Sequence, residues 1–302
     1  MYHIPVMLAE CLEGLAINPQ GTYIDVTFGG GGHSKAILEK LDGGKLYAFD
    51  QDDDAAANAK LIDNKHFTFI KANFRHLKKY LRLHNCTKVD GILADLGVSS
   101  HQIDSAERGF STRFDGELDM RMDRNRDVSA KTIINKYSKD DLHKIFGMYG
   151  EVRNAKTLAE GIIQARTSKQ IDTTAELKVI LNRFAPKFSE FKYQAQVFQA
   201  LRMEVNDELV ALEEMLLQTG EVMSPNGRLV VMSYHSLEDR LVKNYINKGK
   251  FHGDIEKDVY GNFYVPFVAL NRKPLEATAT EIAQNNRSRS SKLRVAIKQA
   301  IV

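Results

Sequence analysis

The sequence contains few cysteines and no long apolar segment. Only Cys11 and Cys86 are cysteines among 302 residues, and they lie far apart and form no Cys-x-x-Cys pair. This excludes a cysteine-based zinc site, and we expect no metal site elsewhere in the chain. Two isolated thiols are typical of a protein kept in a reducing compartment, where disulfides are rare. No run of about 18 apolar residues occurs, so we expect neither a membrane span nor a membrane partner.

The N-terminal segment lacks the features of a secretory signal. No basic flank followed by an apolar core is present between residues 1 and 10. A secretory signal needs both parts. Together with the cysteine usage, this predicts a cytoplasmic protein.

Charge of either sign is not in large excess. Charged residues make up 27% and hydrophobic residues 43% of the chain, and the net charge is only +3. This composition is typical of a globular protein with one large domain or two ordinary ones. Residues 271–302 nevertheless carry seven basic and two acidic side chains, a local charge of +5. A basic tail suits a phosphate-bearing partner, but a solvated surface segment has the same composition, so charge alone leaves both interpretations open.

The first part of the chain alternates between strand-like and helix-like segments. β-Branched and aromatic runs predict strands, and the amphipathic or alanine-rich segments between them predict helices. The expected strands are Thr22–Phe28, Lys45–Asp50, Phe67–Ala72 and Val89–Leu96, and the expected helices are His33–Leu41, Asp53–Ile62 and Arg75–His84. Such alternation, with right-handed crossovers, indicates a doubly wound, mostly parallel α/β sheet of the Rossmann-like class.

From about residue 109 the strand pattern stops and capped helices follow. Ser138 with Asp141, and Thr173 with Glu176, have the spacing of helix N-terminal caps. Apolar residues between positions 198 and 216 form a stripe that predicts one long amphipathic helix.

Strand character returns near the end of the chain. A strand is expected at Arg228–Ser233, after a Pro-Asn-Gly turn at residues 225–227, and a closing strand at residues 293–300. We therefore expect an α/β domain of residues 1–108 and 208–302, interrupted by an inserted all-helical domain of residues 109–207.

Four consecutive glycines, residues 29–32, separate the first expected strand from the first expected helix. Ligands of doubly wound sheets bind beyond the carboxyl ends of the strands, where the strand order reverses. Glycines let the backbone approach a ligand closely and offer amide donors at a helix N-terminus. Asp50 ends the second strand, 21 residues after Gly29. A carboxylate at that place is able to accept both hydroxyls of a ribose.

Two nucleotide-type ligands share this geometry. A dinucleotide site requires G-x-G-x-x-G, but the third glycine position is Ser34 counted from Gly29 and Lys35 counted from Gly30. The fingerprint therefore fails, which disfavours a nicotinamide-dependent oxidoreductase. S-adenosylmethionine has no phosphate and needs only a close loop for its amino-acid end, so the spacing favours a methyltransferase.

Asp95 ends the fourth expected strand and is our candidate catalytic residue. Methyl transfer from a sulfonium is a direct displacement in which positioning supplies most of the acceleration. If the acceptor is an exocyclic amine, the Asp95 carboxylate is suited to orient its N–H groups. Contact with the cofactor is the competing role for the same side chain.

Seven sequence blocks, in order along the whole chain, resemble one family. That family is the bacterial ribosomal RNA small subunit methyltransferase H family, also called MraW. The blocks are DVTFGGGGHS (25–34), LADLGVSSHQID (93–104), ERGFS (107–111), DGELDMRMD (115–123), VFQALRMEVNDEL (197–209), SYHSLEDRLVK (233–243) and NNRSRSSKLR (285–294).

The resemblance implies a specific activity. It implies methylation of the exocyclic N4 of one cytidine in the decoding region of 16S ribosomal RNA, with S-adenosylmethionine as cofactor and the small ribosomal subunit as partner. It further implies that the inserted helical domain recognises the substrate, and it leaves a homodimer open. The implied cofactor contacts are Gly31, Gly32, His33, Asp50, Phe74, Asp95 and Gln102.

Two features depart from related patterns. Gly30 stands where relatives often carry a larger residue. Many amino-group methyltransferases place Asp/Asn-Pro-Pro-aromatic after the fourth strand, whereas residues 95–98 read Asp-Leu-Gly-Val. An aromatic ring that stacks on the target base must therefore come from elsewhere, with Phe110, Phe114 and Tyr234 as candidates.

A cytidine in folded RNA must be splayed out to reach the methyl group, which requires contacts to the phosphates and to the base. The candidate RNA contacts are Arg108, Arg113, Tyr234, His235, Arg287, Arg289, Lys292 and Arg294. For His235 a structural role is the alternative. Arg121 and Arg124 lie among Asp115, Asp119 and Asp123, and we expect them to form an internal ion-pair network.

Two further functions remain open from the residues alone. One is an amino methyltransferase acting on DNA, which the missing Pro-Pro motif disfavours. The other is a non-catalytic ribosome-assembly factor with a remnant cofactor site.

Overall fold

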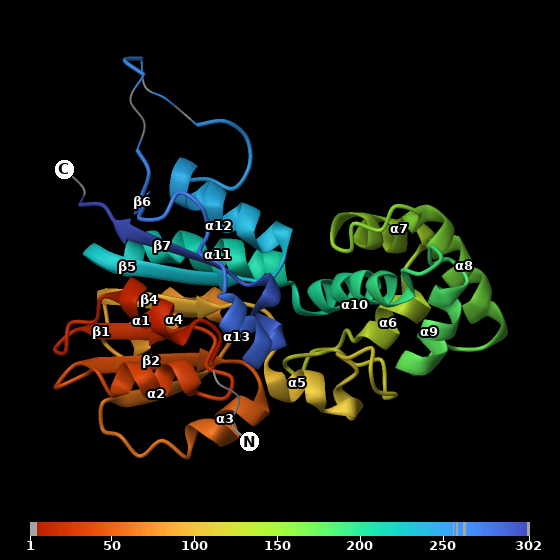
Figure 1. Ribbon diagram of the computed structural model, residues 1–302, viewed down its shortest axis with the longest axis horizontal. Helices are drawn as coiled ribbons and strands as arrows, with labels where there is room; N and C mark the ends of the chain where they lie inside the picture. The colour runs from red at the N-terminus through yellow and green to blue at the C-terminus, as the bar shows by residue number, and fades with distance from the viewer. Residues whose placement is uncertain (1–4, 256, 258, 262–263, 301–302) are drawn as a thin grey trace. The chain divides into compact units, whose positions relative to one another are not determined.

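The computed structural model describes residues 5–255, 257, 259–261 and 264–300 (Figure 1). The chain forms two compact units. The first, here called the sheet unit, contains the residues up to Gly97 and those from Leu209 onward. The second, the helical unit, spans Val98–Glu208.

The sheet unit is built on seven strands in the order β3-β2-β1-β4-β5-β7-β6. β1 to β5 are parallel to one another, whereas β7 runs antiparallel to both β5 and β6. The strands are β1 (Thr22–Asp25), β2 (Lys45–Asp50), β3 (Phe67–Lys71), β4 (Val89–Asp95), β5 (Met223–Ser233), β6 (Phe267–Ala269) and β7 (Lys292–Lys298). The expected doubly wound, mostly parallel sheet is confirmed, and its strand order reverses between β1 and β4.

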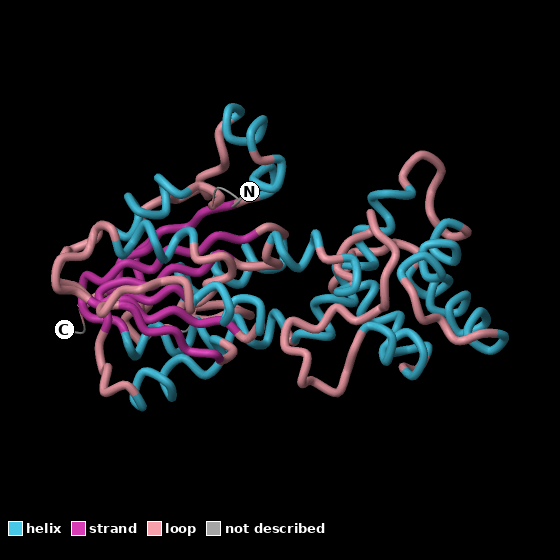
Figure 2. Tube along the Cα trace, turned by 90° about the horizontal axis from the view of Figure 1, so that it is seen from below, coloured by secondary structure: helices cyan, strands magenta, loops and turns pink. Residues whose placement is uncertain are grey.

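Helices cover both faces of this sheet (Figure 2). On one face of the sheet, a buried cluster contains side chains of the strands and of α4, α11 and α12. On the other face, a second cluster contains side chains of the strands and of α1 and α2. In β1, Tyr23 belongs to the second cluster and Ile24 to the first, as the two-residue period of a strand requires. The helices are α1 (Leu8–Leu15), α2 (Gly32–Leu38), α3 (Asp53–Ala59), α4 (Leu77–Leu83), α11 (Glu208–Val222), α12 (Ser236–Lys248) and α13 (Ala279–Gln284), with short 3-10 turns at Phe74–His76 and Asn286–Ser290.

The helical unit, all of whose residues are described, contains no strand; Glu117 and Thr173 form an isolated bridge. Both expected N-terminal caps are confirmed, Ser138 for α7 and the Thr173–Glu176 capping box for α9. Its helices are α5 (Ser100–Asp104), α6 (Ala130–Lys136), α7 (Lys139–Met148), α8 (Ala155–Ser168), α9 (Thr174–Asn182) and α10 (Glu190–Asn206), with a 3-10 turn at Ala106–Arg108. They enclose a core of their own.

The helical unit begins at Val98 rather than at the expected residue 109. The reason is that residues 105–109 pack against the segment that follows them. The amide of Met120 donates to the carbonyl of Arg108 at 3.0 Å, and a Cβ on Gly109 would lie only 2.1 Å from the carbonyl oxygen of Glu117.

Two further expectations about elements were wrong. The apolar stripe between 198 and 216 belongs to two helices, because Asp207 adopts a left-handed conformation (φ +51°) and ends α10. The Pro-Asn-Gly segment at 225–227 does not precede β5 but lies inside it. There the register with β4 is irregular between Val89 and Gly91, which pair with Met223 and Arg228.

Within the part of the chain that the structure describes, no helix combines the length and the apolar character needed to cross a membrane.

Candidate cofactor site at the carboxyl edge of the sheet

The glycine loop connects β1 to α2 and is held in a shape that only glycine allows at two positions. Gly31 has φ +77°, and a Cβ there would lie 2.7 Å from the ring of Phe28. A Cβ on Gly32 would lie 2.4 Å from Pro5. At Gly30, by contrast, a Cβ would meet nothing within 4 Å. The loop is thus closely packed at Gly31 and Gly32 and open at Gly30.

Asp25, at the end of β1, braces this loop. Its carboxylate is 1% exposed and accepts hydrogen bonds from the Ser34 hydroxyl at 2.7 Å and from the Thr27 amide at 3.0 Å. The Thr27 hydroxyl in turn accepts a 2.7 Å bond from the amide of Asp95. One buried carboxylate therefore ties the glycine loop to the start of α2, and Thr27 ties it to the end of β4.

Asp50 ends β2 and faces the same loop. Its two carboxylate oxygens accept bonds from the amides of Gly29 (2.8 Å) and Asp52 (2.9 Å). Burial raises the pKa of Asp50 from 3.8 to about 6. Two backbone donors fix the carboxylate, and each oxygen retains a lone pair, so Asp50 is able to accept two hydroxyl groups.

Asp95 ends β4, next to β1, at the point where the strand order reverses. The Tyr234 hydroxyl donates to one of its carboxylate oxygens at 2.7 Å, and Nδ1 of His33 lies 3.8 Å from the other. The side chain is 24% exposed, and burial of the remainder raises its pKa to about 6. Burial and the neighbouring Asp95 charge raise the pKa of Tyr234 well above its usual value, so the phenol stays neutral and donates.

His33 is buried at the start of α2. Its Nε2 lies 3.1 Å from the carbonyl oxygen of Val6, which only accepts, so Nε2 carries the hydrogen. The other ring nitrogen, Nδ1, faces the Asp95 carboxylate. The ring connects the N-terminal segment to the site.

Phe74 follows β3 and opens the 3-10 turn Phe74–His76. It is half-buried against the core cluster of the sheet unit. The preceding Asn73 donates to the side chain of Gln51 at 3.0 Å, which joins this turn to the residue after Asp50. The loops that follow β2 and β3 are thus held together.

Gln102 lies in the helical unit, and its side chain is used locally. It forms a capping box with Ser99: the Gln102 side chain accepts from the Ser99 amide at 2.9 Å, and the Ser99 hydroxyl accepts from the Gln102 amide at 3.2 Å. Gln102 therefore caps the start of α5.

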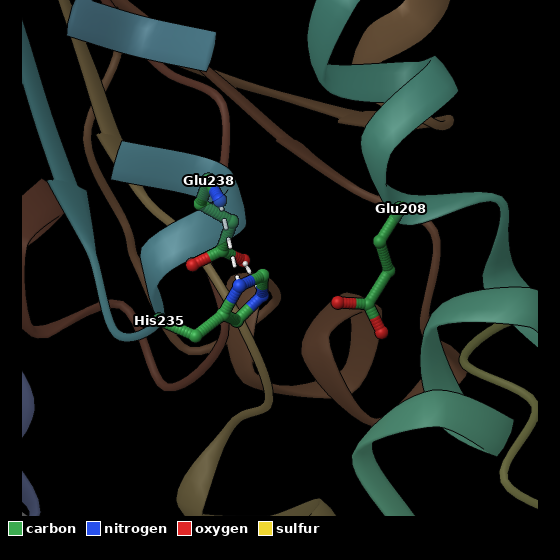
Figure 3. Close-up of side chains that lie close together, drawn as sticks. All are labelled: Glu208, His235 and Glu238. Carbon is green, nitrogen blue, oxygen red and sulfur yellow. Dashed lines mark hydrogen bonds and ion pairs between the residues drawn. The ribbon is translucent and has the colours of Figure 1, made fainter. Parts of the chain in front are cut away.

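Tyr234 and His235 form the turn from β5 into α12, and Glu238 orders that turn. Glu238 is 3% exposed and accepts from the Tyr234 amide at 3.0 Å. Nδ1 of His235 accepts from the Glu238 amide at 3.4 Å, which caps α12. Figure 3 shows the His235 ring beside the Glu238 carboxylate. Nε2 of His235 lies 3.1 Å from Oε1 of Glu238, but the two atoms do not have the geometry of a hydrogen bond. His235 thus has a capping role at the start of α12.

Two of the expected RNA contacts face the protein interior. Arg294 on β7 is 7% exposed, and its guanidinium makes two bonds to Asp239 of α12, at 2.6 and 3.0 Å. Arg108 is 1% exposed and donates to the carbonyl of Arg121 at 2.9 Å. We correct both assignments, because a guanidinium enclosed by its own unit is not free to bind phosphate.

The remaining basic candidates lie nearer the surface. Arg113 is 63% exposed, 3.5 Å from Asp104, and Arg289 is exposed on the 3-10 turn Asn286–Ser290. Arg287, in the same turn, and Lys292, the first residue of β7, are half-buried. Arg121 pairs with Asp119 at 2.5 Å, which confirms its expected ion pair.

The bond between Tyr234 and Asp95 was missed by sequence reasoning, although a signal for it exists. β5 neighbours β4 in the sheet, so residues that follow Ser233 lie beside those that follow β4. A tyrosine directly after β5 is therefore placed to reach Asp95. The order of strands had to be known before this inference was available.

The residues at this edge fit S-adenosylmethionine. Asp50 is fixed by two backbone donors with lone pairs left for ribose hydroxyls, the open side of the glycine loop lies next to it, and the Asp95 carboxylate suits a neighbouring positive charge. None of these features requires a phosphate on the ligand.

Comparison with known proteins identifies the family of the chain. The family model described as the MraW methylase family matches residues 1–299. Ribosomal RNA small subunit methyltransferase H of Cytophaga hutchinsonii is 60% identical over 296 residues, which cover 98% of this chain and 99% of that protein. Proteins of the same name from Amoebophilus asiaticus and Flavobacterium johnsoniae are each 53% identical, over 99% and 98% of this chain and 97% and 98% of theirs. The chain therefore belongs to the MraW methylase family and is an S-adenosylmethionine-dependent methyltransferase.

Proposed function

We propose that this protein transfers a methyl group from S-adenosylmethionine to the exocyclic N4 of a specific cytidine in the decoding region of 16S ribosomal RNA, within the small ribosomal subunit. The relatives that match over nearly the full length are named ribosomal RNA small subunit methyltransferase H. The observation that carries the proposal is the Asp95–Tyr234 pair, which lies beside the glycine loop where the strand order reverses. The reaction takes place in the cytoplasm, where small subunits are assembled.

The residues of the site divide into two groups by role. Asp50 accepts the ribose hydroxyls, Gly31 and Gly32 let the loop approach the amino-acid end, and Phe74 lies against the adenine. Bound S-adenosylmethionine supplies an electrophilic methyl group on a sulfonium, from which a neutral thioether leaves. His33 and Gln102 are the remaining proposed cofactor contacts. The Val6 carbonyl fixes the His33 ring, and Gln102 lies at the start of α5.

Asp95 is the proposed catalytic residue. Its carboxylate accepts an N–H of the cytosine amine and so directs the nitrogen lone pair toward the methyl carbon. As the N–C bond forms, the nitrogen becomes positive and releases a proton, for which the Asp95 carboxylate is the acceptor within the site. The Tyr234 hydroxyl, already bonded to Asp95, holds that carboxylate in one orientation.

RNA contacts are proposed at the exposed or half-exposed candidates. Phosphate contacts come from basic side chains near the surface, and the base is held at the Tyr234 turn, with substrate recognition also assigned to the helical unit. The residues are Arg113, Tyr234, His235, Arg287, Arg289 and Lys292.

Mass spectrometry of 16S ribosomal RNA tests the proposal. A strain without this gene is expected to lack one methyl group on N4 of one cytidine, and the wild-type gene is expected to restore it while Asp95→Ala does not. Purified small subunits from the deletion strain are expected to accept labelled methyl groups, whereas duplex DNA is not. Methylation of DNA alone would support the DNA enzyme instead, and restored subunit assembly without methylation would support a non-catalytic factor.

A further inference from the structure

Two phenylalanines of the helical unit are almost fully exposed. Phe188 is 96% and Phe191 85% exposed, and they are three residues apart at the start of α10. Single exposed apolar side chains are common on folded proteins. Two almost fully exposed aromatic rings only three residues apart are uncommon, and they indicate an interaction surface.

The segment that carries these rings is anchored at its base. Phe184 packs so closely on α8 that a Cβ on Gly161 would lie 2.1 Å from its ring. The side chain of Asn154 donates to the carbonyl of Phe184 at 2.9 Å, and the Ser189 amide donates to the carbonyl of Pro186 at 3.1 Å. The rings are therefore exposed on a held turn and do not belong to a loose loop.

The backbone of this turn is held in an unfavourable conformation. Phe188 has φ +62°, a left-handed conformation that a bulky side chain seldom adopts. Its amide donates to the side chain of Glu190 at 3.2 Å, which supports that conformation. Residues held this way cluster at ligand-binding segments, and here the effect is a phenylalanine turned fully into solvent.

Exposed basic side chains flank the two rings along the chain. Arg183, Lys187 and Lys192 are all exposed, and the acidic residue of the turn, Glu190, is half-buried and accepts the Phe188 amide. Aromatic rings interleaved with cationic side chains are the chemistry that binds single-stranded nucleic acid, since the rings stack on bases while the cations follow the phosphates.

We propose that Phe188 and Phe191 form a stacking platform for unpaired bases of the RNA substrate, with Lys187 and Lys192 contacting the adjoining phosphates. This inference rests on the proposed function and extends it, because the platform lies on the helical unit and uses none of the cofactor-site residues. It assigns to that unit a recognition mode that depends on RNA single strands.

The chain has no tryptophan, so Phe188→Trp introduces a single indole fluorophore at the platform. Titration with purified small subunits, and with a single-stranded RNA oligonucleotide, is expected to quench its emission as bases stack on the ring. The matched control is Tyr260→Trp, since Tyr260 is also exposed (86%) but belongs to the sheet unit. Its emission is expected to change little.

The same variant separates the competing occupants. Vesicles of phosphatidylcholine and phosphatidylglycerol would shift the emission to the blue and strengthen it if the platform binds lipid. A blue shift that grows with protein concentration, without any ligand, would indicate a second copy of the chain. Either of these results without quenching by RNA overturns the proposal.

Binding and rate measurements then distinguish this proposal from the proposed function. Phe188→Ala with Phe191→Ala is expected to raise the Kd for small subunits about tenfold, the loss of roughly one base stack, with cofactor affinity unchanged. If wild-type protein methylates the subunits and the double variant has the same Kd and KM, the platform is refuted while the methyltransferase function stands. If wild-type protein does not methylate them, the function fails, and quenching by RNA still decides the platform.

Discussion

Asp50 and Asp95 show how two residues of one type acquire different surroundings. Burial raises the pKa of both to about 6. Asp50 is held by two backbone amides, whereas Asp95 is held by the Tyr234 phenol and faces His33. The first arrangement suits static binding of hydroxyls, and the second places a carboxylate between a phenol donor and an imidazole ring.

The raised pKa of Asp50 predicts a pH-dependent cofactor affinity. As pH falls through about 6, Asp50 becomes protonated and loses acceptor capacity, so the Kd for S-adenosylmethionine is expected to rise. Asp50→Asn is expected to raise that Kd at pH 8 by roughly tenfold or more and to flatten its pH dependence, as the loss of charged hydrogen bonds implies. Calorimetry at pH 5 and pH 8 measures both effects.

Asp63→Asn, at an exposed position of the sheet unit, is the matched control and is expected to bind S-adenosylmethionine like wild type.

The raised pKa of Asp50 also affects the stability of the fold, with a defined sign. Since the folded state holds this proton more tightly than the unfolded chain, the Asp50 contribution to the free energy of unfolding falls as pH rises from 3.8 to about 6. In the binding experiment, equal Kd values of the wild type for S-adenosylmethionine at pH 5 and pH 8 would contradict the assignment of Asp50 to the cofactor site.

Tyr234→Phe removes the hydroxyl that orients Asp95. We expect kcat to fall about tenfold, the cost of one hydrogen bond to a charged group, with the Kd for S-adenosylmethionine little changed. Because the Tyr234 bond lowers the pKa of Asp95, its removal is expected to move the acid limb of the pH–rate profile to higher pH. Tyr260→Phe, at an exposed tyrosine, serves as the control. If the acid limb of the pH–rate profile does not move in Tyr234→Phe, the ionisation of Asp95 does not control the rate.

At the scale of elements, the contact between β7 and α12 explains why not every basic side chain of residues 271–302 is available to bind a phosphate. The side chains of Arg294 and Asp239 are 8% and 14% exposed and form a two-bond ion pair. Arg289 lies five residues earlier and is exposed. Two arginines of the same sequence block thus differ in environment because one lies on a strand covered by a helix.

This difference predicts opposite outcomes for two matched variants. Arg294→Met leaves the Asp239 carboxylate buried without its partner and is expected to lower the free energy of unfolding by about 3 kcal/mol. Arg289→Met is expected to leave stability unchanged and to reduce the slope of log K against log salt for RNA by about 1. Chemical denaturation and salt titration of subunit binding measure the two effects. A stable Arg294→Met variant with a reduced salt slope would reinstate Arg294 as a phosphate contact.

Elements with strong local signals followed the sequence closely. The caps at Ser138 and Thr173 formed as expected, because an N-cap depends on residues only three positions apart. The break at Asp207 was missed because hydrophobic spacing continues through it, and a single left-handed residue leaves no trace in that spacing. The register irregularity in β5 was missed for a similar reason, since a turn-forming sequence is also compatible with a bulge.

At the scale of the whole molecule, the proposed cofactor site, apart from Gln102, and part of the proposed RNA recognition lie in different units. Asp50, Asp95 and Tyr234 belong to the sheet unit, and Phe188 and Phe191 to the helical unit. Each unit has its own buried core, so changes to the platform are expected to leave the cofactor site intact.

By itself, the sequence determined the alternation of strands and helices, the glycine loop and the carboxylates at the ends of β2 and β4. These features depend on neighbours close along the chain or on the two-residue period of a strand, so the sequence alone predicts them. Only the tertiary structure decided that Tyr234 bonds to Asp95, that Arg294 and Arg108 turn inward and that Phe188 turns outward. A side chain's direction and burial depend on which element packs over it, and that element is commonly far away in sequence.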